Sequence, residues 1–353
     1  MTFKLKSVAA GLALAGLSLG AFAQSSVTVS GTIDAYVGSM KNAGDPGRTA
    51  VLGSGGMTTS WIGFKGTEDL GGGLQAGFAL TSFLRVDGGS YGRFDGDPIY
   101  SRDANVYLSG GYGKVTLGRG LAPNFLPTIL ANPLGDSFTF APLVLHSNIN
   151  TAGWPRRTTP ADTGWSNEVI YSTPNFGGFS ANLHYQLGEQ SSGTGNSGAG
   201  NVGVNFLYFG GPLSLVGYYE HDEIGNPFPG LLTTPVGGVS VPETRTDWMV
   251  GGAWDFKWLK LFGTYGQSKA DVADYDAKTG SLGVGVPIGA GTLSGAVAQT
   301  KVEGSYNGTR TTATVGYDYY LSKRTDVYAM FMHDEVTDLN DGNSFGVGIR
   351  HRF

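Results

Sequence analysis

The chain has 353 residues, of which 59 are glycine and none is cysteine, and it contains 6 tryptophans, 17 tyrosines and 19 phenylalanines. Glycine is about 17% of the chain, against a usual level of roughly 7%, but there is no Gly-X-Y repeat and collagen is excluded. The 40% hydrophobic content argues against a disordered polymer, and the lack of cysteine excludes disulfides and thiol catalysis. A formal charge of −5 argues against a nucleic-acid partner. Many glycines and aromatics with only 14% charged residues indicate an all-β protein in a membrane.

Residues 1–23 have the features of a secretory signal peptide. Lys4 and Lys6 give a basic start, an apolar run follows, and Ala21-Phe22-Ala23 is a small-x-small cleavage signal. The alternative, a transmembrane anchor, requires a longer run. We therefore expect residues 24–353 to form the mature, exported chain. No later stretch approaches the length of about 18 apolar residues that a spanning helix needs, so a membrane-embedded form must be a closed barrel.

Apolar and polar residues alternate with a period of two in several segments along the chain. The clearest are residues 27–34, 180–187, 312–319 and 344–353. In each segment an apolar outer set alternates with an inner set of mostly Ser, Thr, Asn and Gly, which is typical of transmembrane barrel strands. A soluble sandwich also alternates, but its polar set faces bulk water and carries more charge. The composition favours a narrow water-filled lumen.

Short and long connections alternate between the expected strands. Tight joints lie at Glu68–Gly73, Gly110–Gly113, Pro174–Gly178, Gly210–Pro212, Asp255–Trp258, Pro287–Gly291 and Leu321–Lys323. Longer polar stretches lie near residues 41–57, 87–98, 120–166, 189–200, 223–243, 269–276, 304–308 and 336–342. This alternation matches the short periplasmic turns and longer external loops of outer-membrane barrels. It predicts about 16 antiparallel strands, a number that leaves an aqueous channel open.

Residues 120–166 form a connection that is too long for a simple loop in a compact barrel. The stretch is unusually apolar, with residues such as Phe125, Leu134, Phe140 and Leu143. An apolar loop is expected to be packed, and the space available is the barrel interior. We therefore expect this third external loop to fold inward and narrow the channel. The alternative is an external lid or a partner-binding patch.

Five stretches, spread over the mature chain, resemble one known family. They are Gly63-Phe64-Lys65-Gly66-Thr67-Glu68-Asp69-Leu70-Gly71-Gly72-Gly73, Lys114-Val115-Thr116-Leu117-Gly118-Arg119, Tyr171-Ser172-Thr173-Pro174-Asn175-Phe176-Gly177-Gly178-Phe179, Leu321-Ser322-Lys323-Arg324-Thr325 and Val347-Gly348-Ile349-Arg350-His351-Arg352-Phe353. The chain resembles the general diffusion porins of Gram-negative outer membranes, especially the beta-proteobacterial branch. The resemblance implies a homotrimer of 16-stranded barrels with one pore per subunit, passing small solutes and ions. It also implies that the final Phe353 helps the barrel-assembly machinery recognise the chain.

In such porins a ladder of basic side chains on the wall faces the inward loop. Strand parity places Trp61 and Lys65 in the lumen, because Ile62 and Phe64 form the apolar set, and it leaves Arg85 inward in the next strand.

Arg102 is assigned to the pore by the resemblance alone, since parity is ambiguous there. Arg119 closes the fifth strand where the long loop begins. Opposite them the loop offers Asp136 and Asp162, beside Arg156 and Arg157. For each basic residue a solvated strand end is the alternative.

Two positions depart from the family pattern. The family usually has arginine where Trp61 stands, and it commonly has a carboxylate near Thr81. The loss of a pore arginine, together with the Leu, Ile and Phe side chains of the long loop, should weaken the field across the pore. We therefore hypothesise a narrower, less polar constriction that admits small amphiphilic or aromatic solutes comparatively well. Acidic residues cluster in the expected external loops, where divalent cations could bridge them to lipopolysaccharide. These acidic residues would attract cations, whereas the basic residues of the wall would favour anions, and the sequence does not decide between the two effects.

No motif for catalysis, a cofactor or a metal is found. The five histidines are dispersed without metal-ligand spacing. His184 and Ser180 are the best nucleophile–base candidates, but four residues along a strand is about 13 Å, too far for that chemistry. Besides a general porin, two alternatives remain: a substrate-selective channel, for which the aromatic track is fragmentary, and an adhesin or receptor that uses its external loops.

Overall fold

The computed structural model describes residues 26–148, 164–189, 198–228 and 230–353. The expected signal peptide therefore lies outside the described residues, as do Arg156, Arg157 and Asp162 of the long loop. Within the described ranges, no helix is long and apolar enough to cross a membrane.

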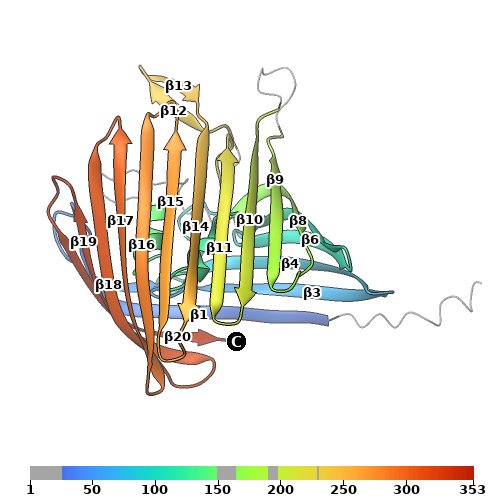
Figure 1. The fold of residues 1–353 in the computed structure, drawn as a ribbon, viewed down its shortest axis with the longest axis horizontal. Coiled ribbons are helices and arrows are strands. Elements are labelled where there is room, and N and C mark those ends of the chain that lie inside the picture. The colour runs from blue at the N-terminus through green and yellow to red at the C-terminus, as the bar shows by residue number, and fades with distance from the viewer. Residues whose placement is uncertain (1–25, 149–163, 190–197, 229) are drawn as a thin grey trace, which may run out of the picture.

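One antiparallel sheet of 18 strands closes on itself to form a barrel (Figure 1). Sixteen of these strands make the wall, and two short ones, β2 (Thr49–Ser54) and β5 (Ser90–Tyr91), are added at its edge. The wall strands are β1 (Ser26–Met40), β3 (Trp61–Gly71), β4 (Leu74–Arg85), β6 (Asp103–Gly110), β7 (Gly113–Leu121), β8 (Gly164–Ser172), β9 (Phe179–Leu187), β10 (Gly200–Gly210), β11 (Leu213–Asp222), β14 (Arg245–Asp255), β15 (Lys260–Ala270), β16 (Tyr275–Ile288), β17 (Gly291–Gly304), β18 (Gly308–Tyr320), β19 (Thr325–Val336) and β20 (Gly342–Arg352). Each of the tight joints expected from the sequence connects two consecutive wall strands, and the prediction of about 16 antiparallel strands is confirmed.

The barrel is closed by β1, which pairs with β3 at its start and with β20 along its second half. The backbones of Gly31 and Phe353 exchange two hydrogen bonds of 3.1 Å, which extends this seam to the last residue. The pairing of β1 with β3 ends at Thr32. From Ala35 to Met40, the same edge of β1 pairs instead with β2, which folds back against it. Filling an open edge satisfies backbone groups that an unpaired strand leaves exposed.

Strand parity separates an outer apolar face from an inner polar face, as the alternation in the sequence predicts. In β18, Val315 is 49% exposed whereas its neighbour Thr314 is 4% exposed. In β20, Val347 and Ile349 are exposed whereas Ser344 is fully buried. Outward apolar side chains are therefore available to lipid, and the inward positions carry hydroxyls, amides and charges.

Besides β2 and β5, one hairpin and two short helices were not expected from the sequence. The hairpin of β12 (Thr233–Val236) and β13 (Val239–Pro242) projects above one end of the barrel (Figure 1). The long loop contains two short helices, α2 (Phe125–Leu130) and α3 (Pro142–Asn148). Helices of six and seven residues are too short to show a clear hydrophobic period, so pattern reading does not find them.

Candidate pore and constriction

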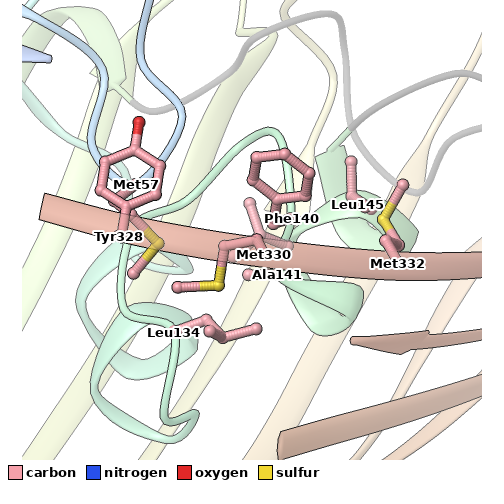
Figure 2. Packing of buried hydrophobic residues seen from close by; sticks show 9 residues of the cluster. Met57, Leu134, Phe140, Ala141, Leu145, Tyr328, Met330 and Met332 are labelled. Atoms are coloured by element: carbon pink, nitrogen blue, oxygen red, sulfur yellow. The ribbon is translucent and has the colours of Figure 1, made fainter. Parts of the chain in front are cut away.

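The described part of the long loop packs against the inner face of one side of the barrel. Helix α2 contacts β10, β11 and β14, and helix α3 contacts β16, β17 and β18. Between the helices, Leu134 and Phe140 are buried against Met330, which points inward from β19 (Figure 2). The loop thus lies over the inner surface from β10 to β19.

Polar contacts hold the loop to the same side. The imidazole of His146 in α3 lies between two wall hydroxyls, with Nδ1 2.8 Å from Thr300 Oγ1 and Nε2 2.8 Å from Thr312 Oγ1. Arg310 is fully buried and forms an ion pair of 2.9 Å with Asp334 on the neighbouring strand. These contacts fix the position of α3 on the wall.

On the opposite side of the lumen, the described residues enclose a cavity. A cavity of about 500 Å³ lies beside the inner faces of β3, β4 and β6 to β10, and Leu121 and Leu126 at the start of the loop form part of its lining. The described part of the loop covers the wall from β10 to β19, and this cavity lies between it and the wall that starts at β3. Lys65 lines this cavity, as parity predicts.

Trp61, Lys65 and Arg102 form one group on that open wall. The Arg102 guanidinium lies 4.2 Å from the centre of the Trp61 ring, and the Lys65 ammonium lies 5.9 Å from it. A cation over an indole face is stabilised by the ring quadrupole. Trp61 therefore occupies the place of a charge and also orients two neighbouring cations.

A carboxylate next to this group partly neutralises it. Asp103 Oδ2 accepts hydrogen bonds from Arg102 at 2.8 Å and from the Thr81 hydroxyl at 2.6 Å. The family's carboxylate near Thr81 is absent from the sequence, but Asp103 supplies a negative charge at the same place. Sequence reasoning missed this role, which follows only from the cross-strand pairing of Thr81 with Asp103.

Asp136 stands on the loop between α2 and α3. Its Oδ1 accepts a hydrogen bond of 2.9 Å from the Thr58 hydroxyl. Burial raises the pKa of Asp136 above its ordinary value, while the Thr58 hydroxyl and the charges of Arg350 and Arg102 favour the ionised form. The same Thr58 oxygen accepts a hydrogen bond of 2.8 Å from Arg350. Thr58 thus links the loop carboxylate to a cation of the barrel wall.

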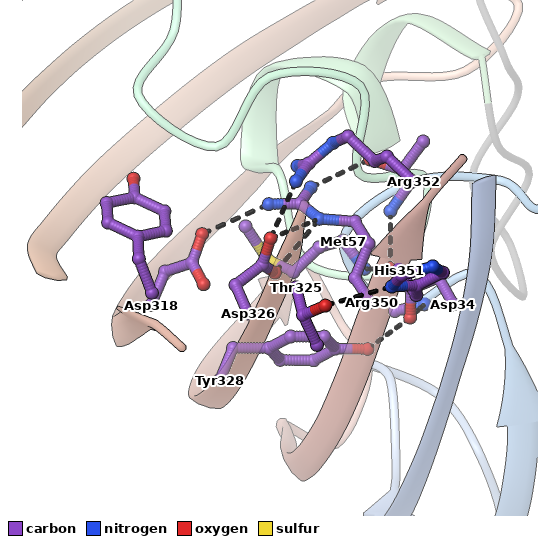
Figure 3. A network of polar contacts seen from close by, with 12 residues as sticks. Asp34, Met57, Asp318, Thr325, Asp326, Tyr328, Arg350, His351 and Arg352 are labelled. Atoms are coloured by element: carbon purple, nitrogen blue, oxygen red, sulfur yellow. Dashed lines mark hydrogen bonds and ion pairs between the residues drawn. The ribbon is translucent and has the colours of Figure 1, made fainter. Parts of the chain in front are cut away.

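The Thr58 segment is itself held by Asp34 on β1. The Asp34 carboxylate accepts hydrogen bonds from the backbone amides of residues 56, 57 and 58 and from the Tyr328 hydroxyl (Figure 3). Ser137 and Thr139 of the loop donate to the carbonyls of Gly56 and Gly55, at 2.7 and 2.9 Å. One buried carboxylate therefore positions the turn before β3, and this turn positions the loop around Asp136.

Arg350 was read from the sequence as an inward residue but not as part of this site. Its guanidinium pairs with Asp326 and Asp318, each at 3.0 Å, in addition to Thr58 (Figure 3). Its side chain is 9% exposed. The alternation in the sequence indicates that Arg350 and Asp318 both point inward. It does not indicate that they meet, because their contact depends on the register of β18, β19 and β20.

Two of the predicted pore residues lie outside the group around Trp61. Arg85, at the end of β4, pairs at 2.7 Å with Asp95, whose side chain is 95% exposed. Arg119 is 6% exposed, and it donates to the Ser101 carbonyl at 2.6 Å and to the Ser166 hydroxyl at 2.9 Å. Arg85 is therefore half-buried at the end of β4, where it pairs with an exposed acid, and Arg119 is buried in the wall where the long loop begins.

Three carboxylates on the covered side also approach one another. Glu220, Asp222 and Asp247 point inward from β11 and β14, and their oxygens lie within 4.8 Å of each other. Asn124, next to α2, donates to Glu220 at 2.8 Å. This acidic group contributes to holding the start of the loop.

Comparison with known proteins agrees with this architecture. The family model described as "Gram-negative porin" matches residues 9–339. The chain belongs to the Gram-negative porin family. It is 34% identical to outer membrane porin protein 32 of Delftia acidovorans over 90% of this chain and 86% of the relative. It is 29% identical to an outer membrane porin protein of Bordetella pertussis over 99% of this chain and 100% of the relative.

Among solved structures, the anion-selective porin from Comamonas acidovorans is similar to this porin with a TM-score of 0.78. The two share 29% sequence identity, and the match covers 93% of this chain and 100% of the other. This porin is therefore a channel of the Gram-negative outer membrane through which small solutes and ions diffuse passively. The resemblance to the porin family stated from the sequence is confirmed.

Proposed function

We propose that the passage between the loop and the β3–β9 wall is the narrow part of the channel, and that residues 120–166 form its constriction loop. The observation that supports this proposal is the seating of α2 and α3 on β10 to β18, with the 500 Å³ cavity on the other side. Transport is passive and involves no catalysis. The constriction is bounded by Trp61, Lys65 and Arg102 on the wall and by Asp136 on the loop.

Liposome swelling with sugars of graded size tests this function. A smooth fall in rate with increasing sugar size supports a general diffusion pore. Rates that saturate with concentration for one sugar support a specific channel, and an absence of swelling contradicts both.

We infer a preference for anions at the constriction. Lys65 lines the cavity, and Arg102 lies beside it over the Trp61 ring, where Asp103 offsets its charge. The printed description of the Comamonas structure is that of an anion-selective porin. Reversal potentials in a KCl gradient test the preference, and a potential of the sign expected for potassium permeation contradicts it.

A second candidate, a channel selective for small amphiphilic or aromatic solutes, is favoured by the Trp61–Arg102 stack. Trp61→Arg restores the cation that the family usually has at this position. We expect a higher conductance for chloride and a lower relative permeability for aromatic solutes in this variant. Unchanged single-channel conductance and ion selectivity would show that Trp61 does not line the constriction.

We also propose that the barrel assembles as a homotrimer and that lipid and lipopolysaccharide surround this trimer. We further propose that the barrel-assembly machinery recognises Phe353. The support for Phe353 is its exposure of 42% at the end of the closing seam. Migration on gels before and after heating tests the trimer. Deletion of Phe353 is expected to reduce the amount of folded protein in the outer membrane without removing the folded pore's conductance.

A further inference from the structure

The cavity on the open side of the lumen has two chemically different surfaces. One carries Lys65 and Lys114, from β3 and β7, together with the amides of Asn182 and Asn205. The other is formed by the aliphatic side chains of residues 79, 121, 126 and 170. A passage that only conducts water needs no aliphatic side chains beside the cations of its lining.

The two lysines are available to an anion. In the part of the chain that the structure describes, neither ammonium group is paired with a carboxylate. Lys65 lies 5.9 Å from the Trp61 ring and Lys114 lies 5.5 Å from the Tyr107 ring, so aromatic faces orient both. The acidic side chain of the lining, Asp103, is bonded to Arg102 and Thr81. The net charge of the polar surface is therefore positive.

The amides between the lysines and the loop are held in fixed orientations. Asn182 Nδ2 donates to Asn205 Oδ1 at 2.7 Å, and Asn205 Nδ2 donates to the carbonyl of Pro123 in the loop at 3.1 Å. His184 Nδ1 lies 2.6 Å from Glu168, and its Nε2 accepts from Asn205 at 3.3 Å. Such a network offers preorganised polar groups to a solute and needs no rearrangement when the solute binds.

We propose that this cavity is a transit binding site for small amphiphilic organic anions, such as aromatic carboxylates. The carboxylate faces Lys114, and the apolar body contacts Ile170 on the neighbouring strand together with Leu121 and Leu126. Lys65 lies farther along the same cavity wall and adds to its positive charge. A cavity of about 500 Å³ accommodates a single-ring solute with several waters. The inference rests on the proposed function in that it takes the passage to run along this wall.

Conductance measured in sodium benzoate, sodium acetate and sodium chloride tests the proposal, with benzoate as the probe. A bound solute makes conductance saturate, whereas free diffusion makes it rise in proportion to concentration. We expect the half-saturating concentration to be about tenfold lower for benzoate than for acetate, because only benzoate buries an apolar ring. A linear rise in benzoate up to the highest concentration would overturn the proposal.

Lys114→Gln removes one cation of the site, and Lys323→Gln is the matched control because it removes an exposed cation from a distant short turn. We expect Lys114→Gln to raise the half-saturating benzoate concentration by about fivefold or more, with a change below about twofold in chloride conductance. Lys323→Gln should leave both unchanged. Equal losses for benzoate and chloride would mean that Lys114 acts only on the general field, and the site would be rejected. Chloride conductance measures whether the channel conducts ions at all. A variant that conducts chloride normally without saturation by benzoate would therefore contradict the binding site and not the proposed channel.

Discussion

Phe140 is a fully buried side chain that helps to seat the loop on the barrel wall, and we expect its truncation to have a measurable consequence for the channel. The ring is fully buried, packs with Leu134 and Met330, and lies 5.8 Å from the Tyr36 ring in an edge-on arrangement. Replacing a buried Phe by Ala costs about 3–5 kcal/mol. Every 1.4 kcal/mol is about a tenfold change in an equilibrium.

Phe140→Ala is therefore expected to raise the ratio of detached to seated loop by roughly two to three orders of magnitude. Because a detached loop no longer narrows the lumen, single-channel records should show frequent excursions to higher conductance that the unmodified protein lacks. Leu130→Ala is the matched control, since Leu130 is 36% exposed and its truncation leaves no comparable cavity. A folded Phe140→Ala barrel with records indistinguishable from those of the unmodified protein would refute this account of the loop.

Two further predictions concern the barrel seam and an external loop. A Cβ atom at Gly31 would lie 2.6 Å from the Phe353 ring, so Gly31→Val should slow barrel closure. The fraction of protein that shows heat-dependent migration on gels should then fall. Gly47→Val is the control and should not have this effect, because the space around Gly47 is open. Burial opposes the ionisation of Glu243, but four hydrogen bonds outweigh it and lower its pKa. The carboxylate therefore stabilises the β12–β13 hairpin at neutral pH and ceases to do so as the pH falls through that lowered pKa. Hydrogen exchange in the hairpin should accelerate there, and Glu243→Gln should remove this pH dependence.

The wall of the barrel was predictable from the sequence because every inward or outward choice is local. A period of two identifies the lipid face, and glycine-rich joints mark the turns. Parity predicted that Lys65 faces inward, and Lys65 lines the cavity. Parity did not reveal the ion pair that Arg85 forms with Asp95, because the two residues are joined by a turn and a loop whose course the period of two does not describe.

The constriction was predictable only in part because its contacts join residues that are far apart in the chain. Thr58, Asp136 and Arg350 meet through a single hydroxyl, although they come from the first turn, the long loop and the last strand. No local pattern indicates this meeting. Likewise, the pairing of Asp103 with Thr81 restores a carboxylate that the family pattern placed elsewhere, and only the strand register reveals it.

The central claim is that solutes pass along the β3–β9 wall and not along the wall that the loop covers. The chain has no cysteine, so a single introduced thiol can be modified selectively. Thr67→Cys lies on β3 in the open cavity, whereas Thr279→Cys lies on β16, where the native threonine is 1% exposed beneath α3. A charged methanethiosulfonate reagent should reduce the current through the Thr67→Cys channel and leave the Thr279→Cys channel unchanged. Block of Thr279→Cys without block of Thr67→Cys would place the passage on the other side of the loop and contradict the account.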